Sequence, residues 1–405
     1  MAESFAYTVR TRQGKIVAGK MEADGESAVA LRLRAKGLIP IQIDKAAKIS
    51  AKTELHILPQ RVKLRDMAIF ARQFATMINA GLSLLRTLNI LGEQTENPML
   101  AKHILLVRDD VERGSSLSAA MSKYPKIFNP LFISMVKAGE TGGQLDIVLE
   151  RVANGFETDY KLRQKVKSAM TYPVVVAFIA VALVSVMLVF VVPTFANMFT
   201  GLGGTLPLPT KILLVLSEKS KILIPLFVFL SVGGAFAYKR AKQTSADARL
   251  FFDKAKLKVP VFGELFQKVA ISRFARTLAL LLKAGVPVLQ ALDIVSESTG
   301  NEVLARAAQD VKENVRRGES MAAPLERHEV FPPMVVQMIS VGEDTGSVDA
   351  MLDKVADFYD QEVESTTESL TSLIEPVMIA VLGGIVGSMI IALYMPMFKI
   401  FDLVK

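Results

Sequence analysis

The stretch from Leu145 to Pro193 constrains the fold of this chain more than any other. In its first half, apolar residues recur at steps of three and four, which is typical of a helix with one buried and one solvated face. Beyond Lys167 the charges stop, and Pro173 to Pro193 holds about 21 uncharged residues, roughly 31 Å of helix. That length matches the hydrocarbon core of a bilayer. The pattern predicts one continuous helix that leaves a soluble domain and enters a membrane.

The same pattern occurs again near the end of the chain. Val348 to Tyr359 repeats the amphipathic stripe, and Pro376 to Pro396 repeats the uncharged run. Between the two copies lies a further apolar run, Ile222 to Tyr238, which is short for a span unless residues 212–216 extend it. At 405 residues and 51% hydrophobic, the chain is too long for one core and too apolar for an ordinary soluble enzyme. We therefore expect an all-α membrane protein with three transmembrane helices.

Residues 1–44 follow a different pattern. Short alternating runs and one helical stretch predict a small N-terminal β-β-α-β piece, with strands near residues 5–9, 16–17 and 39–43 and a helix at 26–36. Residues 1–20 contain no apolar stretch like that of a signal peptide, so we expect the N-terminus to stay in the cytoplasm.

From Leu64 onward, the periodicity becomes that of an antiparallel helical bundle. Gly81 ends the first helix, because glycine adopts the left-handed conformation of a C-terminal cap without strain. Ser83 and Asn97 are placed to cap the next two helices, and Pro98 suits a first helical turn. About five short helices lead into the long one.

This bundle is duplicated. Short motifs of the first half return at an offset of 204 residues and, after the loss of one residue, at 203. The matched pairs are Phe70-Ala71-Arg72 with Phe274-Ala275-Arg276, Ala80-Gly81 with Ala284-Gly285, Ser83 with Pro287 as a first-turn residue, Arg113-Gly114 with Arg317-Gly318, Gly139-Glu140 with Gly342-Glu343, Asp146 with Asp349, Pro173 with Pro376, and Pro193 with Pro396. The sequence thus predicts two cytoplasmic bundles, each joined to its own span.

Orientation follows from the basic residues beside the spans. Four positive charges between Lys161 and Lys167 precede the first span and none follows it closely, so its N-terminal side is predicted to be cytoplasmic. Lys239, Arg240 and Lys242 follow the second span. Four glutamates between Glu362 and Glu375 precede the third span and favour the opposite orientation, but the first helix usually sets topology.

The predicted segments are an α+β N-terminal domain at 1–44, a linker at 45–63, cytoplasmic helical domain 1 at 64–170, transmembrane helix 1 at 171–193, an extracytoplasmic loop at 194–211, transmembrane helix 2 at 212–238, cytoplasmic helical domain 2 at 239–374, transmembrane helix 3 at 375–398 and an extracytoplasmic tail at 399–405.

The residues around the first span resemble the signature of a known family. Lys165-Val166, Ala169-Met170, Tyr172-Pro173, Met187 and Val191-Val192-Pro193 are similar, position by position, to the type II secretion F and type IV pilus inner-membrane platform proteins. The match extends from about Leu64 to the end of the chain as the family's paired domains, and residues 1–44 look like its variable leader. The second copy departs from the signature, with Glu375-Pro376 in place of Tyr172-Pro173. Gly383, Gly384 and Gly387 there predict close packing against another span.

The resemblance implies a non-enzymatic, oligomeric platform in the bacterial inner (cytoplasmic) membrane. Such a platform is implied to couple a hexameric cytoplasmic assembly or retraction ATPase to the insertion or extraction of pilin or pseudopilin subunits. Other inner-membrane platform components and further copies of the chain are implied partners. No cofactor or metal is expected, and the net charge of +8 is assigned to anionic lipid and acidic proteins rather than to nucleic acid.

Seven residues are candidate partner contacts, and each also has a plainer structural interpretation. They are Arg72, Arg276, Glu140, Glu343, Asp146, Asp349 and Glu375. Glu140 and Asp146 flank a glycine-rich turn before the long helix, where the helix dipole favours negative charge. The alternative is a partner contact in which a hard cation bridges the carboxylates. Arg72 suits an intradomain ion pair, and Glu375 lies at the edge of an apolar run within reach of headgroups.

The sequence shows no enzyme motif. Without cysteine it has no disulfide, thiolate metal site or cysteine nucleophile. His56, His103 and His328 are isolated, and the glycines of residues 201–211 lack P-loop spacing. A transporter or channel is the first alternative function, although the spans lack the charged groups that such paths need. A receptor whose bundles bind a signalling partner is the second, and co-purification of a kinase rather than an ATPase would favour it.

Overall fold

The computed structural model describes residues 3–10, 16–23, 25–35, 39–45, 61–201 and 207–403. Two compact units divide between Arg61 and Val62, and the predicted linker lies mostly outside the described residues. In the first unit, strands β1 (Glu3–Arg10), β2 (Ile16–Ala23) and β3 (Ile39–Lys45) form an antiparallel sheet in the order β2-β1-β3, with helix α1 (Glu26–Ala35) before β3. Ala23, Val29 and Leu33 are buried there.

The second unit begins with five short helices, α2 (Leu64–Asn79), α3 (Leu84–Gln94), α4 (Pro98–Glu112), α5 (Leu117–Ser122) and α6 (Pro130–Gly142). The Asn97 and Asn129 side chains accept hydrogen bonds from backbone amides at the start of α4 and α6. Gly81, at φ +82°, adopts the predicted left-handed conformation. Ser83 is the N-cap residue of α3 as predicted, but its hydroxyl makes no capping hydrogen bond.

The long helix begins at Leu145 as predicted but does not end at Pro193. Helix α7 (Leu145–Val186) continues through a π-helical segment, η1 (Met187–Val191), into α8 (Val192–Gly201). Pro193 is tolerated because it falls in the first turn after the π-helical segment, where the hydrogen-bond register has already shifted. The loop predicted at 194–211 is therefore helical over its first residues.

The second repeat follows α9 (Leu208–Thr244) and has the same order of helices. Its elements are α10 (Ala246–Leu257), α11 (Phe262–Lys283), α12 (Val288–Ser298), α13 (Glu302–Arg316), α14 (Ala322–Leu325), α15 (Pro333–Thr345) and α16 (Val348–Leu403). Pro287 lies at the cap position before α12, not within its first turn as predicted. Both long helices carry their repeat into an apolar segment.

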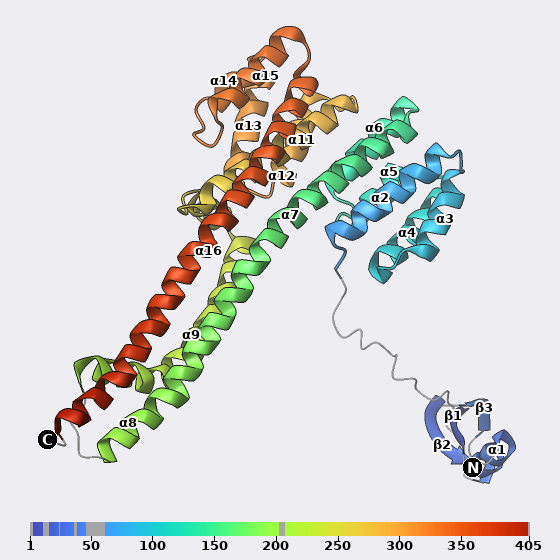
Figure 1. Ribbon diagram of the computed structural model, residues 1–405. Helices are drawn as coiled ribbons and strands as arrows, with labels where there is room; N and C mark the ends of the chain where they lie inside the picture. Colours follow the sequence, from blue (N-terminus) through green and yellow to red (C-terminus); the bar gives the residue numbers. More distant parts are fainter. Residues whose placement is uncertain are drawn as a thin grey trace. The chain divides into compact units, whose positions relative to one another are not determined.

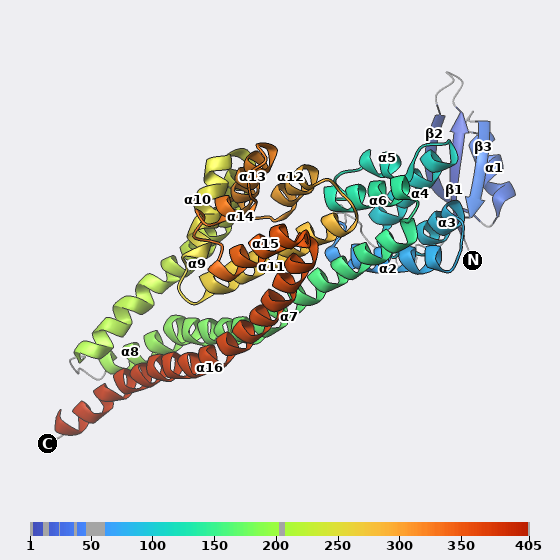
Figure 2. The same ribbon diagram turned by 90° about the horizontal axis from the view of Figure 1, so that it is seen from above.

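Three helical stretches of the described chain are long and apolar enough to cross a membrane: residues 145–198, 208–242 and 348–395. Within the second unit, both bundles lie at one end of α7 and α16, and α8 lies at the other end (Figures 1 and 2). A single apolar core extends through both bundles. Matched aromatic pairs anchor it, with ring centroids 6.0 Å apart for Phe70 and Phe128 and 5.1 Å apart for Phe274 and Phe331.

Helix α9 is fastened to the first span by a hydroxyl group. In η1, the amide of Val192 bonds to the carbonyl of Met187, one residue further back than in an α-helix. The next residue, Pro193, has no amide hydrogen, so the carbonyl of Leu188 has no helical donor. The buried hydroxyl of Ser217 donates to this carbonyl.

The third span has an equivalent contact. The carbonyl of Ala392 would bond to the amide of residue 396 in a regular helix, and residue 396 is a proline. The buried hydroxyl of Thr210 donates to that carbonyl over 2.6 Å. Helix α9 therefore supplies a hydroxyl to each of the two carbonyls that lose a donor at Pro193 and Pro396.

The glycines of the third span do not make the close contact predicted for them within this chain. A Cβ atom added at Gly383, Gly384 or Gly387 would meet no atom of the described structure within 4 Å. Gly383 instead lines an apolar groove between α16 and α7, opposite Ala180 and Leu183.

Candidate functional site

In each repeat, one arginine ties the bundle to its long helix. Arg72 of α2 donates to both carboxylate oxygens of Glu157 on α7, over 2.7 and 2.9 Å. It also contacts Asn154 and, at 3.5 Å, Glu150. The three partners are spaced by four and three residues, so they share one face of α7. We call these four residues the first arginine cluster.

The second arginine cluster repeats this arrangement at every position. Arg276 of α11 contacts Asp353 at 3.3 Å, Asp357 at 2.9 Å and Asp360 at 2.6 Å, all on α16. Each of these partners lies 203 residues after its counterpart in the first cluster. Sequence reasoning identified both arginines but missed their partners, although acidic or amide residues at matched spacing in both copies could have revealed them.

The charges in these clusters stabilise each other. The hydrogen bond from Arg72 lowers the pKa of Glu157, and the same hydrogen bond raises the pKa of Arg72. Burial lowers the pKa of Arg276, but the attraction of Asp360 and Asp357 outweighs this effect and the net pKa is raised. Both arginines therefore stay charged, and the predicted intradomain ion pairs are present in both repeats.

Glu140 and Glu343 do not cap the long helices, contrary to the prediction. The Glu140 carboxylate, at the end of α6, accepts hydrogen bonds from the Leu117 amide and from the amide and hydroxyl of Ser118. Glu343 accepts from the Met321 and Ala322 amides and from a serine hydroxyl. Each glutamate therefore caps the short helix α5 or α14 of its own bundle, because helix N-termini carry amides that lack backbone acceptors.

The glycine before each glutamate lets two helices approach closely. A Cβ atom on Gly139 would lie 3.2 Å from Leu145 Cα, and one on Gly342 would lie 2.8 Å from Val348 Cα. The Gly-Glu pair thus performs two tasks in each repeat. The glycine fits α6 or α15 against the start of the long helix, and the glutamate fixes the short helix.

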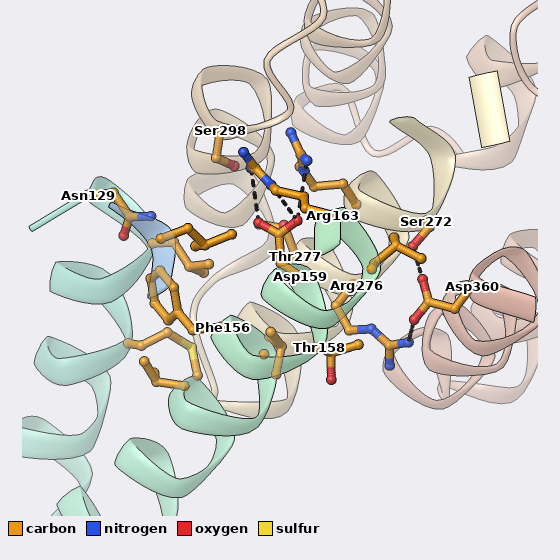
Figure 3. Close-up of a pocket in the computed structure, with 18 residues that line it drawn as sticks. Asn129, Phe156, Thr158, Asp159, Arg163, Ser272, Arg276, Thr277, Ser298 and Asp360 are labelled. Carbon is orange, nitrogen blue, oxygen red and sulfur yellow. Dashed lines mark hydrogen bonds and ion pairs between the residues drawn. The ribbon is translucent and has the colours of Figure 1, made fainter. Parts of the chain in front are cut away.

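The two repeats meet at an ion-pair cluster between α7 and α11, which we call the junction. Asp159 of α7 is 3.2 Å from Arg273 of α11 and 3.0 Å from Arg163 of its own helix. Burial lowers the pKa of Arg273, although Asp159 opposes the effect. Figure 3 shows Asp159 facing Arg163, with the Arg276–Asp360 pair nearby, around a cavity of about 140 Å³ lined by both repeats.

A second set of contacts joins the segments that precede the spans. Lys165, before the first span, pairs with Glu364, before the third. Glu362 is 2.9 Å from Lys268 of α11. Near these ion pairs, Leu162 of α7 and Leu370 of α16 are buried in one apolar cluster. The basic segment of one repeat therefore neutralises part of the acidic segment of the other.

The remaining candidate residues are dispersed. Asp146 and Asp349 lie in the first turns of α7 and α16, where the helix dipole favours them as predicted. Glu375 is exposed on α16. Among the signature residues, Tyr172 is exposed, Pro173 is buried, Pro193 is half-buried and Pro376 is exposed; the side chain of Pro396 lies outside the described set. In the described part of the chain, no three acidic or histidine side chains are arranged to hold a metal ion.

These features define a class: a helical membrane protein built from two copies of one bundle, each clamped by an arginine to a helix that continues into the membrane. The pattern of the family described as "Type II secretion system (T2SS), protein F" matches residues 70–193 and 274–396, and that of its N-terminal domain matches residues 1–44. Two relatives are named type IV pilus assembly protein PilC. One, from Thermus thermophilus, is 43% identical over 98% of each chain; the other, from Myxococcus xanthus, is 39% identical over 98% of this chain and 94% of its own.

A type II secretion system protein F from Vibrio cholerae is 32% identical over 99% of both chains. The chain belongs to the protein F and PilC family of type II secretion and type IV pilus platform proteins. This family is not enzymatic.

Proposed function

We propose that this chain is an inner-membrane platform that couples a cytoplasmic ATPase to the insertion or extraction of pilin or pseudopilin subunits. The observation that carries the proposal is the mechanical continuity of each repeat. Helix α7 runs from the first bundle into the apolar segment without a break, and α16 does the same for the second bundle. Since Arg72 and Arg276 clamp the bundles to these helices, a force on a bundle reaches the membrane segment.

Cytoplasmic placement of both bundles is supported by the ion pairs before the spans. The four glutamates that favoured the opposite orientation of the third span are partly neutralised, because Lys165 pairs with Glu364 and Lys268 with Glu362. Fewer unpaired glutamates before the third span then oppose the orientation that the basic residues of the first span favour. In this orientation, both bundles are within reach of a cytoplasmic motor.

Among the candidate contact residues, we assign partner contacts to the exposed ones. Asp146, beside the exposed Ile147, lies at the end of the first bundle and is proposed to meet the ATPase. Glu375 and the glycines of α16 are proposed to meet a pilin-like subunit, another platform component or a second copy of the chain. Co-purification of the full chain with the ATPase, with a pilin and with a differently tagged copy tests each partner separately.

The lever itself is tested by breaking its continuity. Three glycines inserted after Ser168 should leave ATPase binding intact and abolish fibre assembly, because the bundle would no longer move its span. The matched control carries three glycines after Lys52, in the predicted linker, and should assemble fibres normally. Normal assembly by the Ser168 insertion would remove the lever proposal.

A further inference from the structure

The turn between α10 and α11 exposes apolar side chains outside the spans. The exposed fractions are 69% for Phe251, 58% for Val261, and 42% each for Val259 and Phe266. Scattered exposed apolar residues need no explanation, but four within a short stretch form a patch of the kind that marks an interaction site. We call residues 251–266 the α10–α11 corner.

The backbone of the corner is strained at Val261, one of the four exposed residues of this patch. Val261 has φ +71°, and it is the one non-glycine residue with positive φ in the described chain. The amide of Phe262 donates to the carbonyl of Pro260 over 2.8 Å, which closes a tight three-residue turn around Val261. A β-branched residue in this conformation is costly, and such strain concentrates at functional positions.

The corner lies at the depth where the chain enters its apolar segments. On α9, the Tyr238 ring at the end of the second span is 4.8 Å from the Phe252 ring of α10. On the side of α7, Phe266 shares a groove with Lys167 and Met170, just before the first span. Figure 2 shows α10 at the end of α9, beside the second bundle.

The third span also places the corner at the level where the apolar segments begin. Leu265, next to Phe266, is buried with Leu370 of α16, a few residues before Pro376. Tyrosine and basic residues at span ends are typical of the headgroup region, and here Tyr238 is followed by Lys239 and Arg240. All three spans therefore place the corner beside the bilayer surface.

The charge of the corner suits an anionic surface. Lys254 on α10 and Lys258, which directly follows the helix, are exposed on the same side as Phe251. Both acids of the corner are paired: the buried Asp253 with Lys242 over 2.7 Å, and the exposed Glu264 with Lys268 over 2.6 Å. Basic residues beside exposed aromatic and aliphatic ones are the composition of segments that lie in a membrane interface.

We propose that the α10–α11 corner is a docking surface for anionic lipid headgroups, with Val261 and Phe266 inserted at the top of the acyl region and Lys254 and Lys258 on the phosphates. Continuity with the three spans favours lipid over a protein occupant. The proposal needs the spans to lie in a bilayer but no particular partner, so it can stand if the coupling proposal fails.

The chain contains no tryptophan, so a single introduced one reports on its own surroundings. We expect Val261→Trp and Phe266→Trp, in nanodiscs containing phosphatidylglycerol, to emit at shorter wavelength than the control Leu85→Trp, which is 40% exposed on α3. Lipids brominated near the headgroup should quench the two corner variants at least twofold and leave the control unquenched. Phe266→Trp lies in a regular helix, so it remains informative if Val261→Trp misfolds.

The basic residues are tested in the Phe266→Trp background. Lys254→Glu with Lys258→Glu should reduce lipid quenching in nanodiscs with phosphatidylglycerol and change it little in pure phosphatidylcholine. Quenching by aqueous acrylamide equal to that of the control would overturn the proposal. So would protection from acrylamide without lipid quenching, because that result assigns the corner to a protein partner or a second copy.

Discussion

At the scale of single residues, arginine is the residue type that this clamp requires. Arg72 reaches an acid, an amide and a second acid on successive turns of α7, and only the planar guanidinium offers enough donors in a fixed fork. Its copy, Arg276, meets three aspartates instead. Arg276 is also less exposed than Arg72, with 19% against 34% of its side chain accessible.

The glutamate caps should contribute measurably to stability. We expect Glu140→Ala to lower the free energy of unfolding by about 2 kcal/mol, since it leaves two amides and a hydroxyl of α5 without their acceptor. The exposed Glu112→Ala in the same bundle serves as control and should change stability by less than about 0.5 kcal/mol. Thermal unfolding of the full chain in detergent measures both. Equal melting temperatures for the two variants would contradict the capping role.

The first arginine cluster makes stability depend on pH on the acid side. The pKa of Glu157 is lowered in the folded chain, so the ion pair stabilises the fold above the ordinary glutamate pKa of about 4.3, and this contribution is lost as pH falls through the folded-state value. Because both side chains are about a third exposed, the contribution is below about 1 kcal/mol. We expect Glu157→Gln to be less stable than the natural chain at pH 7 and equally stable near pH 3. A constant difference across this range would argue against the ion pair.

At the scale of elements, the repeated prolines explain how α9 is held. A proline inside a helix removes a donor, and in an apolar surrounding the freed carbonyl is costly unless another group satisfies it. Pro193 is accommodated by the π-helical segment and the Ser217 hydroxyl, and residue 396 by the Thr210 hydroxyl. The prolines of the family signature thus create the acceptors that attach α9 to both spans.

A double-mutant cycle tests this attachment. Ser217→Ala should cost about 1 kcal/mol in the natural chain, because it leaves the Leu188 carbonyl without a donor. In a Pro193→Ala background the backbone amide returns, the carbonyl regains a helical donor, and the same substitution should cost little. A coupling energy of about 1 kcal/mol, measured by unfolding in bicelles, is the expected result. Strictly additive effects would show that the proline and the hydroxyl act independently.

The elements that could be predicted from sequence are those set by local patterns. Asn97 marked a helix start correctly, and the two long helices were evident from their stripes and uncharged runs. The helix continues past Pro193, which the sequence did not predict, because the π-helical segment absorbs the proline. Glu140 was placed near the wrong helix, since the donors that bind its carboxylate lie on α5, and nothing local to Glu140 says which N-terminus folds against it.

At the scale of the whole molecule, the junction couples the two repeats. Arg273 pairs with Asp159 across the repeats, and the Arg151 guanidinium adds a hydrogen bond to the backbone carbonyl of Lys283. The sequence did not predict this junction, because the paired residues lie more than a hundred positions apart. Contacts of this kind follow from the packing of the two bundles, not from either one.

Breaking the junction should separate the stabilities of the repeats. We expect Arg273→Gln to cost about 2 kcal/mol, because it leaves Asp159 with only an exposed partner in a partly buried site. Hydrogen exchange should then quicken at the facing ends of α6 and α11 before the bundle interiors. Arg163→Gln also removes a partner of Asp159 but does not cross between repeats, and it should cost less than about 0.5 kcal/mol. Similar effects for both variants would mean that the crossing contact is unimportant.

The pairing of Lys165 with Glu364 has a consequence for how such a duplicated chain can evolve. A chain that joined two first halves would set lysine against lysine where the spans begin, and two second halves would set glutamate against glutamate. Each half carries the charges that neutralise the other at this point. Neither half can therefore be replaced by a second copy of the other. The two repeats have therefore become complementary in charge, and a charge reversal in one repeat requires the opposite reversal in the other.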